Sequence, residues 1–475
     1  MLEGLKINEK MLKDVYTNKD YRIDSQFYTD NILKNPLLTY RKIGDILLSS
    51  QYGISIEMNE LNIGNPIYRM NEIHSMLCDL EINKSAKISD TEIETFRLKD
   101  KDVLYNRTNS FDWVGRTGIF YKNDNIDYVF ASYLVRFVPN PKIVKPEYLA
   151  CFLSSKTGVK EIRKRARESI NQTNVNPEEV KDIEIPIISD ELQTKIEQNF
   201  TKANRLRIKS KILYEQANAI LFDDLQLDKP KEFNTVNIKS FQESFAKTGR
   251  LDAEYYQPKY DVLFNHLNNI ETKKLGSIVN IKKSIEPGSE AYKDTGIAFI
   301  RVSNLSKFGL TRSEIYLDPI KYAREELYLK KDTILLSKDG SVGIAYKVEE
   351  ELNVITSGAL LHLDVICNEF LPDYVTLVLN SPIVQLQAER DAGGSIIQHW
   401  KPSEIKQVII PKLPINIQKE ISDLIQLSFL FKKQSKRLLE IAKSAVEIAI
   451  EQNEEVAIDY INSHSELMSE DGNLH

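Results

Sequence analysis

The chain has 475 residues, of which 42% are hydrophobic and 28% charged, a composition typical of a globular protein with roughly two to four domains. Its formal net charge of −6 excludes a protein coated with positive charge, although a local basic patch can still bind nucleic acid. Three widely spaced cysteines argue against a disulfide framework or a zinc–thiolate site. The chain shows neither a signal peptide nor a run approaching the ~20 apolar residues of a membrane span. We therefore expect a cytoplasmic protein with no membrane partner.

The first part of the chain predicts a mixed domain of short strands followed by a helix. Runs rich in Val, Ile, Tyr and Phe, broken by Gly, Asn and Asp, predict strands at 101–105, 118–122 and 128–138. Residues 145–166 predict a helix, because a proline followed by an acid suits a first helical turn and its dipole. A short strand that contains a proline then leads into a long helix.

Residues 189–228 predict this long helix, and residues 415–457 predict another. In each, apolar and small residues recur at alternating steps of four and three, which is the 3.5-residue period of a coiled-coil seam. The first series is Leu192, Ile196, Asn199, Ala203, Leu206, Ser210, Leu213, Ala217 and Ile220, and the second is Ile417, Ile421, Leu424, Ser428, Phe431, Ser435, Leu438, Ala442 and Ala445. We expect the two helices to pair with each other; the alternative is that each packs only on its own domain.

The second half of the chain repeats the first in the same order. The matched blocks are 21–32 with 249–260, 41–47 with 273–279, 65–73 with 297–305, 102–107 with 333–338 and 118–122 with 343–347. Further on, Ser169, Gln172, Glu179, Lys181, Pro186 and Gln193 match Ser395, Gln398, Glu404, Lys406, Pro411 and Gln418 at an offset close to 225. A constant order and offset indicate a duplicated domain followed by a duplicated helix.

The duplication predicts the domain boundaries. They are 1–188 for the first domain, 189–228 for the first long helix, 229–247 for a linker, 248–414 for the second domain, 415–457 for the second long helix and 458–475 for a polar tail.

Nucleotide-binding loops and zinc-protease motifs are missing from the sequence, but two near-matches to catalytic motifs are present. Residues 65–68, NPIY, resemble the Asn-Pro-Pro-Tyr box of amino-methyltransferases, but their repeat partner is IAFI and no Gly-rich cofactor loop accompanies them. Asp373, Glu404 and Lys406 resemble a metal-dependent nuclease motif, so a self-contained nuclease is the alternative function. The other interpretation of these residues is a helix opening and a structural turn.

Five blocks of the second copy carry a family signature. They are GRLDAEYYQPKYD (249–261), KLGSIV (274–279), LLSKDGSVGIAY (335–346), GGSIIQHWKPSEIKQVIIPKLP (393–414) and IQKEI (417–421). In this order they resemble the DNA-specificity subunit of type I restriction–modification systems, and the resemblance covers almost the whole chain. The first copy departs from the pattern at YNRTNSFDWVGRTGIFY (105–121), which replaces LSKDGSVGIAY.

The resemblance implies an α+β fold in which two mixed α/β target-recognition domains are joined and separated by two long antiparallel coiled-coil helices, with a pseudo-two-fold internal repeat. It implies a protein without a catalytic centre that reads a bipartite site on double-stranded DNA, one half per domain. The partners it implies are two adenine methyltransferase subunits and, in some systems, a restriction motor-nuclease subunit. The chain itself is expected to bind no cofactor or metal; S-adenosylmethionine would belong to the methyltransferase, and ATP and Mg²⁺ to the motor-nuclease.

Candidate DNA contacts follow from residue type, because phosphates are bound by Lys and Arg while bases are read by planar amides or guanidinium groups. A basic run supplies Lys160, Arg163, Lys164, Arg165 and Arg167, for which the alternative is a solvated face. Matched positions supply Arg69 with Arg301, Arg107 with Lys338 and Gln172 with Gln398, for which the alternative is a structural bond. Ser341 and His399 complete the set. An assembly scaffold that reads no sequence is a further alternative for the whole chain.

Overall fold

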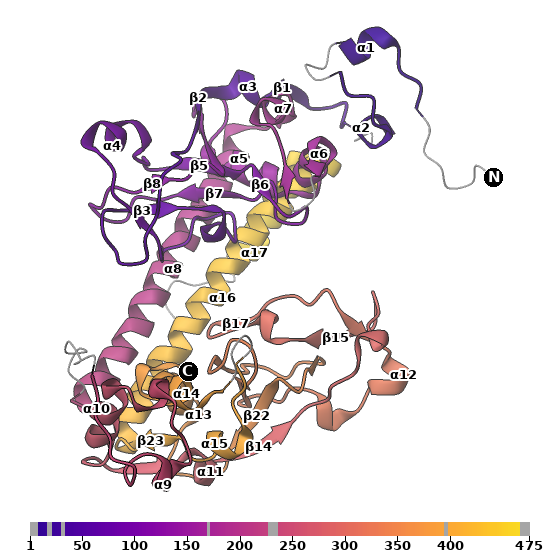
Figure 1. Cartoon of the computed structure of the whole chain (residues 1–475). Helices are drawn as coiled ribbons and strands as arrows, with labels where there is room; N and C mark the ends of the chain where they lie inside the picture. The colour runs from indigo at the N-terminus through magenta and orange to yellow at the C-terminus, as the bar shows by residue number, and fades with distance from the viewer. Residues whose placement is uncertain are drawn as a thin grey trace. The chain divides into compact units, whose positions relative to one another are not determined.

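The structure is a computed structural model that describes residues 8–16, 21–29, 34–168, 172–226, 236–393 and 398–465. The chain divides into two compact units: the first holds residues 1–209 and 431–475, and the second holds residues 210–430. Each unit contains a four-stranded sheet, short helices and a segment of each long helix (Figure 1). Residues 227–235, which include the end of the predicted first long helix and the start of the predicted linker, and residues 466–475 of the predicted tail lie outside the described residues.

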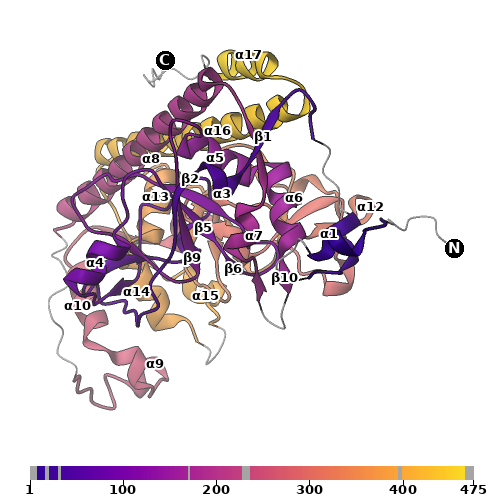
Figure 2. The same ribbon diagram turned by 90° about the horizontal axis from the view of Figure 1, so that it is seen from above.

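The first unit is built on an antiparallel sheet. Its strands, in order across the sheet, are β2 (Leu47–Tyr52), β9 (Leu134–Pro139), β5 (Asp102–Asn106) and β7 (Thr117–Phe120). β5 and β7 are buried along their whole length, as their apolar runs predict. Helix α5 (Pro146–Ser154) packs against β5, β7 and β9 (Figure 2). The stacked rings of Tyr105 and Phe137, with centroids 5.7 Å apart, belong to this core.

The helix predicted over 145–166 is two helices, α5 and α6 (Lys156–Arg165), because Ser155 interrupts it. Ser155 has extended backbone angles, and its hydroxyl accepts a hydrogen bond from Gly158 N at 3.1 Å, which caps α6. The second unit has the same break at Ser381, before the proline that begins α14. The prediction of one continuous helix over 145–166 is therefore wrong.

Smaller sheets complete the first unit. β4 (Ser85–Ala86), β3 (Asn65–Tyr68) and β8 (Val129–Phe130) form one of them, with β3 and β8 parallel. The NPIY run is thus a strand. The single strand predicted over 128–138 is divided between β8 and β9, because residues 131–133 turn from one sheet into the other. β1 (Thr39–Lys42) pairs with β12 (Glu184–Ile187), directly before the first long helix.

Three sheets of the second unit have the same strand order and directions as sheets of the first. β14 (Val279–Lys283), β22 (Leu360–Val365), β19 (Ile334–Ser337) and β20 (Ala345–Lys347) correspond to β2, β9, β5 and β7. β15 (Ile297–Ile300) pairs in parallel with β21 (Ile355–Thr356), and β13 (Thr272–Lys274) pairs with β23 (Ile409–Pro411). Helices α13 (Pro372–Asn380) and α14 (Pro382–Asp391) take the places of α5 and α6. The shared topology confirms the predicted duplication.

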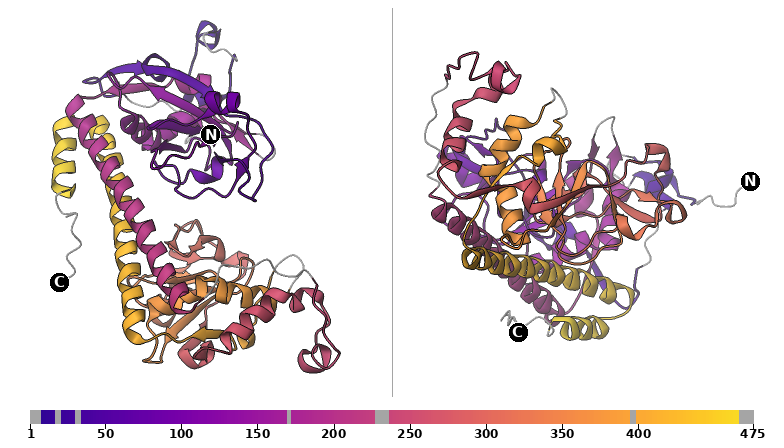
Figure 3. Two further views of the ribbon diagram at one scale, coloured as in Figure 1. Left: turned by 90° about the vertical axis from the view of Figure 1, so that its left-hand side faces the viewer. Right: turned by 90° about the horizontal axis from the view of Figure 1, so that it is seen from below.

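The long helices are α8 (Asp190–Asp224) and α16 (Ile415–Glu451). α16 ends before the predicted boundary at 457, and a further helix, α17 (Glu454–Ser465), spans the end of the predicted long helix and the start of the predicted tail. In the first unit Ser435 donates a hydrogen bond to Ala203 O at 2.7 Å, and in the second Ser428 donates one to Ser210 O at 2.7 Å. In each unit a segment of α8 therefore lies against a segment of α16 (Figure 3).

The globular part of each unit also holds the end of a long helix. In the first unit, Asn35 Nδ2 donates hydrogen bonds to Ile450 O at 3.1 Å and to Gln452 O at 3.2 Å, at the end of α16. In the second unit, His266 Nε2 lies 2.7 Å from Leu225 O, at the end of α8. These bonds satisfy carbonyls that a helix C-terminus leaves without an intrahelical partner.

Candidate nucleic-acid interface

Two loops leave matched strands, β5 and β19, and each begins with a cation predicted to contact DNA. Arg107 N donates a hydrogen bond to Tyr133 O at 3.0 Å, and Arg107 O accepts one from Val175 N at 2.9 Å. Lys338 makes the same two backbone bonds with the corresponding residues of the second unit, at 2.9 and 2.8 Å. The sequence match between Arg107 and Lys338 is therefore confirmed in the backbone.

The same glycine turn closes both loops. Gly115 and Gly343 have φ angles of 86° and 88°, in the left-handed region that favours glycine. Each donates its amide to the last residue of the preceding strand, at 2.8 Å in the first unit and 2.9 Å in the second. The residues inside the turn differ in both length and chemistry: TNSFDWV (108–114) in the first unit and DGSV (339–342) in the second.

In the second unit the predicted residues Lys338, Gln398 and His399 lie together. Lys338 Nζ forms an ion pair with Asp339, and His399 Nδ1 lies 2.8 Å from the other oxygen of the same carboxylate. Gly340 N donates to Gln398 O at 2.9 Å, which ties the two loops together. Burial raises the pKa of Asp339, but hydrogen bonds and charge from Lys338 and His399 outweigh it and hold the pKa below its usual value. Residues 394–397 lie outside the described residues.

Ser341 belongs to the same loop, where Ser337 Oγ donates to its carbonyl at 2.6 Å. Its exposed side chain is therefore carried on a loop whose backbone is fixed.

In the first unit a small three-stranded sheet occupies the matching place. It consists of β10 (Arg167–Glu168), β11 (Thr173–Asn174) and β6 (Thr108–Asn109). The sheet brings Arg167 and Gln172 to the loop that begins at Arg107. Arg167 also pairs with Glu179 at 3.1 Å, so part of its charge is already balanced inside the unit. Residues 169–171 lie outside the described residues.

The sequence match of Gln172 with Gln398 is displaced by one residue. Val175 and Trp400 make equivalent bonds to the cations that begin the loops. Two residues before Trp400 is Gln398, whereas two residues before Val175 is Thr173, which is buried. The offset of 225 that holds in the long helices pairs Gln398 with Thr173, whereas the match to Gln172 needs an offset of 226 and rested on the identical side chain.

Two exposed residues at these loops escaped the sequence analysis. Asn174 is the counterpart of His399, and the 225-residue offset could have revealed it. Trp113, in the first-unit loop, keeps 42% of its surface exposed, and the guanidinium of Arg116 lies over its ring. The loop has no counterpart of this tryptophan in the second unit, so the repeat gave no signal for it. A partly exposed indole offers a face on which a base can stack.

The basic side chains predicted on α6 have different surroundings. Arg163 contacts the first-unit loop: its guanidinium lies 3.7 Å from the Asp112 carboxylate and 5.4 Å from the centre of the Phe111 ring. Lys160 is exposed. Arg165 instead forms an ion pair with Glu161, one turn earlier on the helix.

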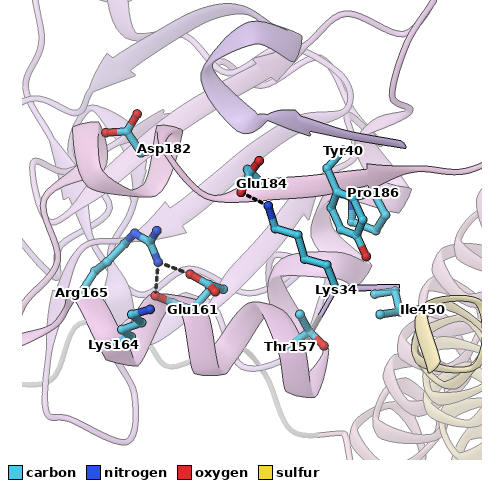
Figure 4. A pocket seen from close by; sticks show the side chains of 10 residues that line it. All are labelled: Lys34, Tyr40, Thr157, Glu161, Lys164, Arg165, Asp182, Glu184, Pro186 and Ile450. Atoms are coloured by element: carbon cyan, nitrogen blue, oxygen red, sulfur yellow. Dashed lines mark hydrogen bonds and ion pairs between the residues drawn. The ribbon is translucent and has the colours of Figure 1, made fainter. Parts of the chain in front are cut away.

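Arg165 and Lys164 line a cavity of about 230 Å³ between α6, β12 and the end of α16 (Figure 4). The cavity also contains Lys34, which forms an ion pair with Glu184. Because Glu161, Glu184 and a further acid, Asp182, match its three cations in number, the cavity has no preference for an anion. Arg165 therefore contributes to a balanced internal network.

Arg69 and Arg301 stand at matched one-turn helices. Arg69 binds the Glu72 carboxylate through its backbone N at 2.8 Å and its guanidinium at 2.5 Å. Arg301 N donates to Asn304 Oδ1 at 3.0 Å, and its side chain is exposed. The guanidinium of Arg69 is thus already held by a carboxylate, whereas that of Arg301 faces solvent.

The nuclease-like residues have structural partners instead. Asp373 is buried, forms an ion pair with Lys347 at 2.8 Å and accepts a hydrogen bond from Ser422 at 2.7 Å. Glu404 accepts a hydrogen bond from Lys401 N at 3.1 Å at the first turn of α15 (Pro402–Ile405). Within the described part of the chain, no group of three or more His, Cys, Asp or Glu residues could hold a metal ion. No helix in the same part is long and apolar enough to cross a membrane.

Comparison with known proteins identifies the family of this chain. The model of the "Type I restriction modification DNA specificity domain" matches residues 38–215 and again residues 268–439. The chain assigned as the type I restriction enzyme MjaX specificity subunit of Methanocaldococcus jannaschii is 23% identical over 436 residues, which cover 86% of this chain and 91% of that one. The EcoKI specificity subunit of Escherichia coli is 25% identical over 166 residues, 34% of this chain and 36% of its own length.

The crystal structure of the type I restriction–modification S subunit from M. genitalium aligns with 90% of this chain and 98% of its own, at 13% identity and a TM-score of 0.41. Specificity proteins are non-catalytic, so the alternative of a self-contained nuclease is wrong. Since the two matched segments together span well over half of the sequence, the chain belongs to the type I restriction–modification DNA specificity family and carries its domain twice.

Proposed function

We propose that this specificity subunit reads a bipartite site on double-stranded DNA, with one half-site for each unit. The observation that carries the proposal is the pair of loops that begin at Arg107 and Lys338. Their backbone bonds and closing glycines are the same, while the residues inside them differ. A constant frame with variable side chains suits two domains that use the same mode of binding for different base sequences.

In this proposal the long helices form an antiparallel coiled coil that separates the two recognition domains. The contacts of Ala203 with Ser435 and of Ser210 with Ser428 support it: as the residue number rises on α8, it falls on α16. A pseudo-two-fold arrangement follows, in which helix length sets the distance between half-sites, as dimer geometry does in other DNA-binding proteins.

The base-reading candidates in the second unit are Lys338, Ser341, Gln398 and His399, and those in the first are Arg107, Gln172 and Asn174. The phosphate-binding candidates are Lys160, Arg163, Lys164 and Arg167, together with Arg301 in the second unit. Arg69 and Arg165, whose guanidinium groups are held by Glu72 and Glu161, are the weakest members of the set.

The proposed partners are two adenine methyltransferase subunits, with S-adenosylmethionine bound to them and no cofactor bound to this chain. A motor-nuclease subunit using ATP and Mg²⁺ would join in a system that also restricts DNA. The duplication supports two equivalent methyltransferase positions, because each unit offers the same fold.

The proposal is tested by co-expression with the methyltransferase of the same gene cluster, followed by mapping of methylated adenines. A bipartite motif is expected. Exchange of residues 14–188 for the corresponding segment of a relative should change one half of the motif and leave the other half unchanged. Methylation that does not respond to the exchange would contradict the proposal, and an exchange of residues 248–414 serves as the reciprocal control.

A further inference from the structure

A short turn occurs once in each unit with the same internal bonds. In the first unit Arg22 Nε donates to the Asp24 carboxylate at 2.6 Å, and the Tyr28 hydroxyl donates to Arg22 O at 2.9 Å. In the second unit Arg250 Nε donates to Asp252 at 2.8 Å, and the hydroxyl of Tyr256 donates to the carbonyl of Arg250 at 3.0 Å. We name residues 22–28 and 250–256 the Arg–Asp turns.

Each turn is fastened to its own unit by the same kind of contact. In the first, the Arg22 guanidinium lies 4.8 Å from the centre of the Phe27 ring, and Lys164 Nζ of α6 lies 5.2 Å from it. In the second, Arg250 and Arg390 of α14 lie 4.5 and 5.0 Å from the Tyr255 ring. Each turn therefore carries an aromatic ring that is contacted by two cations, an attractive arrangement.

Each turn also exposes one apolar side chain. Ile23 keeps 81% of its surface exposed and Leu251 keeps 73%, at the same place between the paired Arg and Asp. Further exposed apolar residues lie upstream, spaced four apart in both units: Leu12 and Tyr16 in the first, Phe241 and Phe245 in the second. A single exposed apolar side chain is common on protein surfaces; what distinguishes Ile23 and Leu251 is that they recur at the same place in two turns with the same internal bonds.

The charge of the Arg–Asp turns and their presence in both units limit which kind of partner can bind to them. Residues 22–28 contain one cation and one anion, and residues 250–256 contain one cation and two anions. The cations packed on the two rings, Lys164 and Arg390, are offset by Glu179 near Arg22 and by Asp391 beside Arg390, so neither turn has an excess of positive charge that would attract phosphate. The loops proposed to read bases differ between the units, whereas the Arg–Asp turns are the same. A surface kept in both copies fits a partner that is identical at both places, namely a protein present twice.

Resting on the proposed function, we infer that the two Arg–Asp turns are docking sites for the two methyltransferase subunits, one on each unit, with Ile23 and Leu251 as the apolar anchors. Truncation of an anchor that inserts between side chains of the partner weakens binding by roughly thirtyfold, and an aspartate at the same place weakens it further because an unpaired charge would be buried.

The test uses the full chain co-purified with its methyltransferase, with stoichiometry measured by native mass spectrometry. Ile23→Asp and Leu251→Asp should each leave one methyltransferase bound, and the double variant should lose both. Leu37→Asp and Ile320→Asp are matched controls, since these residues are 84% and 97% exposed but lie outside the turns; both should retain two methyltransferases. Circular dichroism and thermal unfolding check that each variant is folded.

A second measurement does not depend on substitution by a charge. A photo-crosslinking amino acid at position 23 or 251 should crosslink to the methyltransferase, and the same group at position 320 should not. Crosslinking to DNA, crosslinking to a second copy of this chain, or a double variant that still binds two methyltransferases would each overturn the inference. Failure of the proposed function is distinguishable, because the wild-type chain itself would then bind neither DNA nor methyltransferase.

Discussion

Arg107 and Lys338 occupy the same backbone position in two units whose loops differ, which makes them a matched pair at the scale of single side chains. Arg107 carries a planar guanidinium group, which lies 5.2 Å from the centre of the Tyr52 ring, while Lys338 carries an ammonium group that is paired with Asp339. These chemistries suit different contacts, because Arg binds guanine edges through two donors and Lys does not have that fixed geometry.

We predict that Arg107→Ala relaxes recognition at one position of the first half-site, by about 1–3 kcal/mol of discrimination, without changing the second half-site. Lys338→Ala should affect only the second half-site. The measurement is methylation-motif sequencing of both variants, and each variant is the control for the other. Equal loss of affinity for all sequences in the Arg107 variant would show a phosphate contact instead.

His362, on β22, predicts a pH dependence of stability. Its imidazole is buried, Nε2 lies 2.8 Å from Thr356 Oγ1, and burial lowers its pKa to about 4 despite the nearby Asp364 carboxylate. The folded protein therefore disfavours the charged form that the unfolded chain accepts near pH 6.5, so this stability is present above pH 6.5 and lost as the pH falls through 4. Between pH 7.5 and 5 the loss amounts to about 2 kcal/mol.

The check is the free energy of unfolding of the second unit, from urea titrations at both pH values. His362→Gln should show a smaller decrease than the wild type by that amount. An identical decrease in both proteins would assign the pH dependence to other groups.

At the scale of elements, the seam of α8 and α16 depends on small side chains. Ser428 is 2% exposed and donates its hydroxyl to Ser210 O. A larger side chain there has to displace one of the helices, because their backbones approach closely at this point.

Ser428→Leu should therefore lower the free energy of unfolding by about 1–3 kcal/mol. Asp423→Leu, at an exposed position of the same helix, is the control and should change it by less than about 0.5 kcal/mol. Thermal or urea unfolding measures both. Unchanged stability in the Ser428 variant would contradict close packing at the seam.

Helix α6 gives a prediction about salt. Replacement of Arg163, Lys164 and Arg165 by Ala should flatten the dependence of DNA affinity on salt concentration, by roughly 0.9 in logarithmic slope for each phosphate that is no longer neutralised. We expect the change to correspond to fewer than three phosphates, because Arg165 is paired with Glu161. Lys195→Ala, whose ammonium group binds Asn462 on α17, is the control. A slope equal to that of the wild type would remove α6 from the interface.

Helices and strands were predictable from the sequence where a pattern of apolar residues recurred within a short segment. The residues proposed for the helix seam are buried or half-buried throughout the series, because a 3.5-residue period constrains a face directly. The break at Ser155 was not predictable from the same pattern, since apolar spacing continues across it and only the serine cap interrupts the helix. The assembly of Lys338 with His399 was also hidden, because backbone bonds between distant segments bring them together.

At the scale of the whole molecule, duplication was the strongest signal in the sequence, because many weak matches shared one order. It identified matched cations correctly at Arg107 and Lys338, where strand pairing fixes the register. It misassigned Gln172, because the identical side chain favoured a match to Gln398 over the constant offset of 225, which pairs Gln398 with Thr173. The side chains that should determine specificity, including Trp113, are those in which the copies differ, so repetition cannot find them.

The division of the chain has a consequence for its synthesis. The second unit is continuous, residues 210–430, whereas the first needs residues 1–209 together with 431–475. Asn35 binds carbonyls at Ile450 and Gln452, and Ser189 N donates to Glu454 at 2.9 Å. On the ribosome, the unit translated first therefore has to wait for the last residues to emerge, while the unit translated second can finish before it. In nascent chains arrested with residue 430 just outside the exit tunnel, residues 236–393 should resist protease while residues 34–168 are still cleaved.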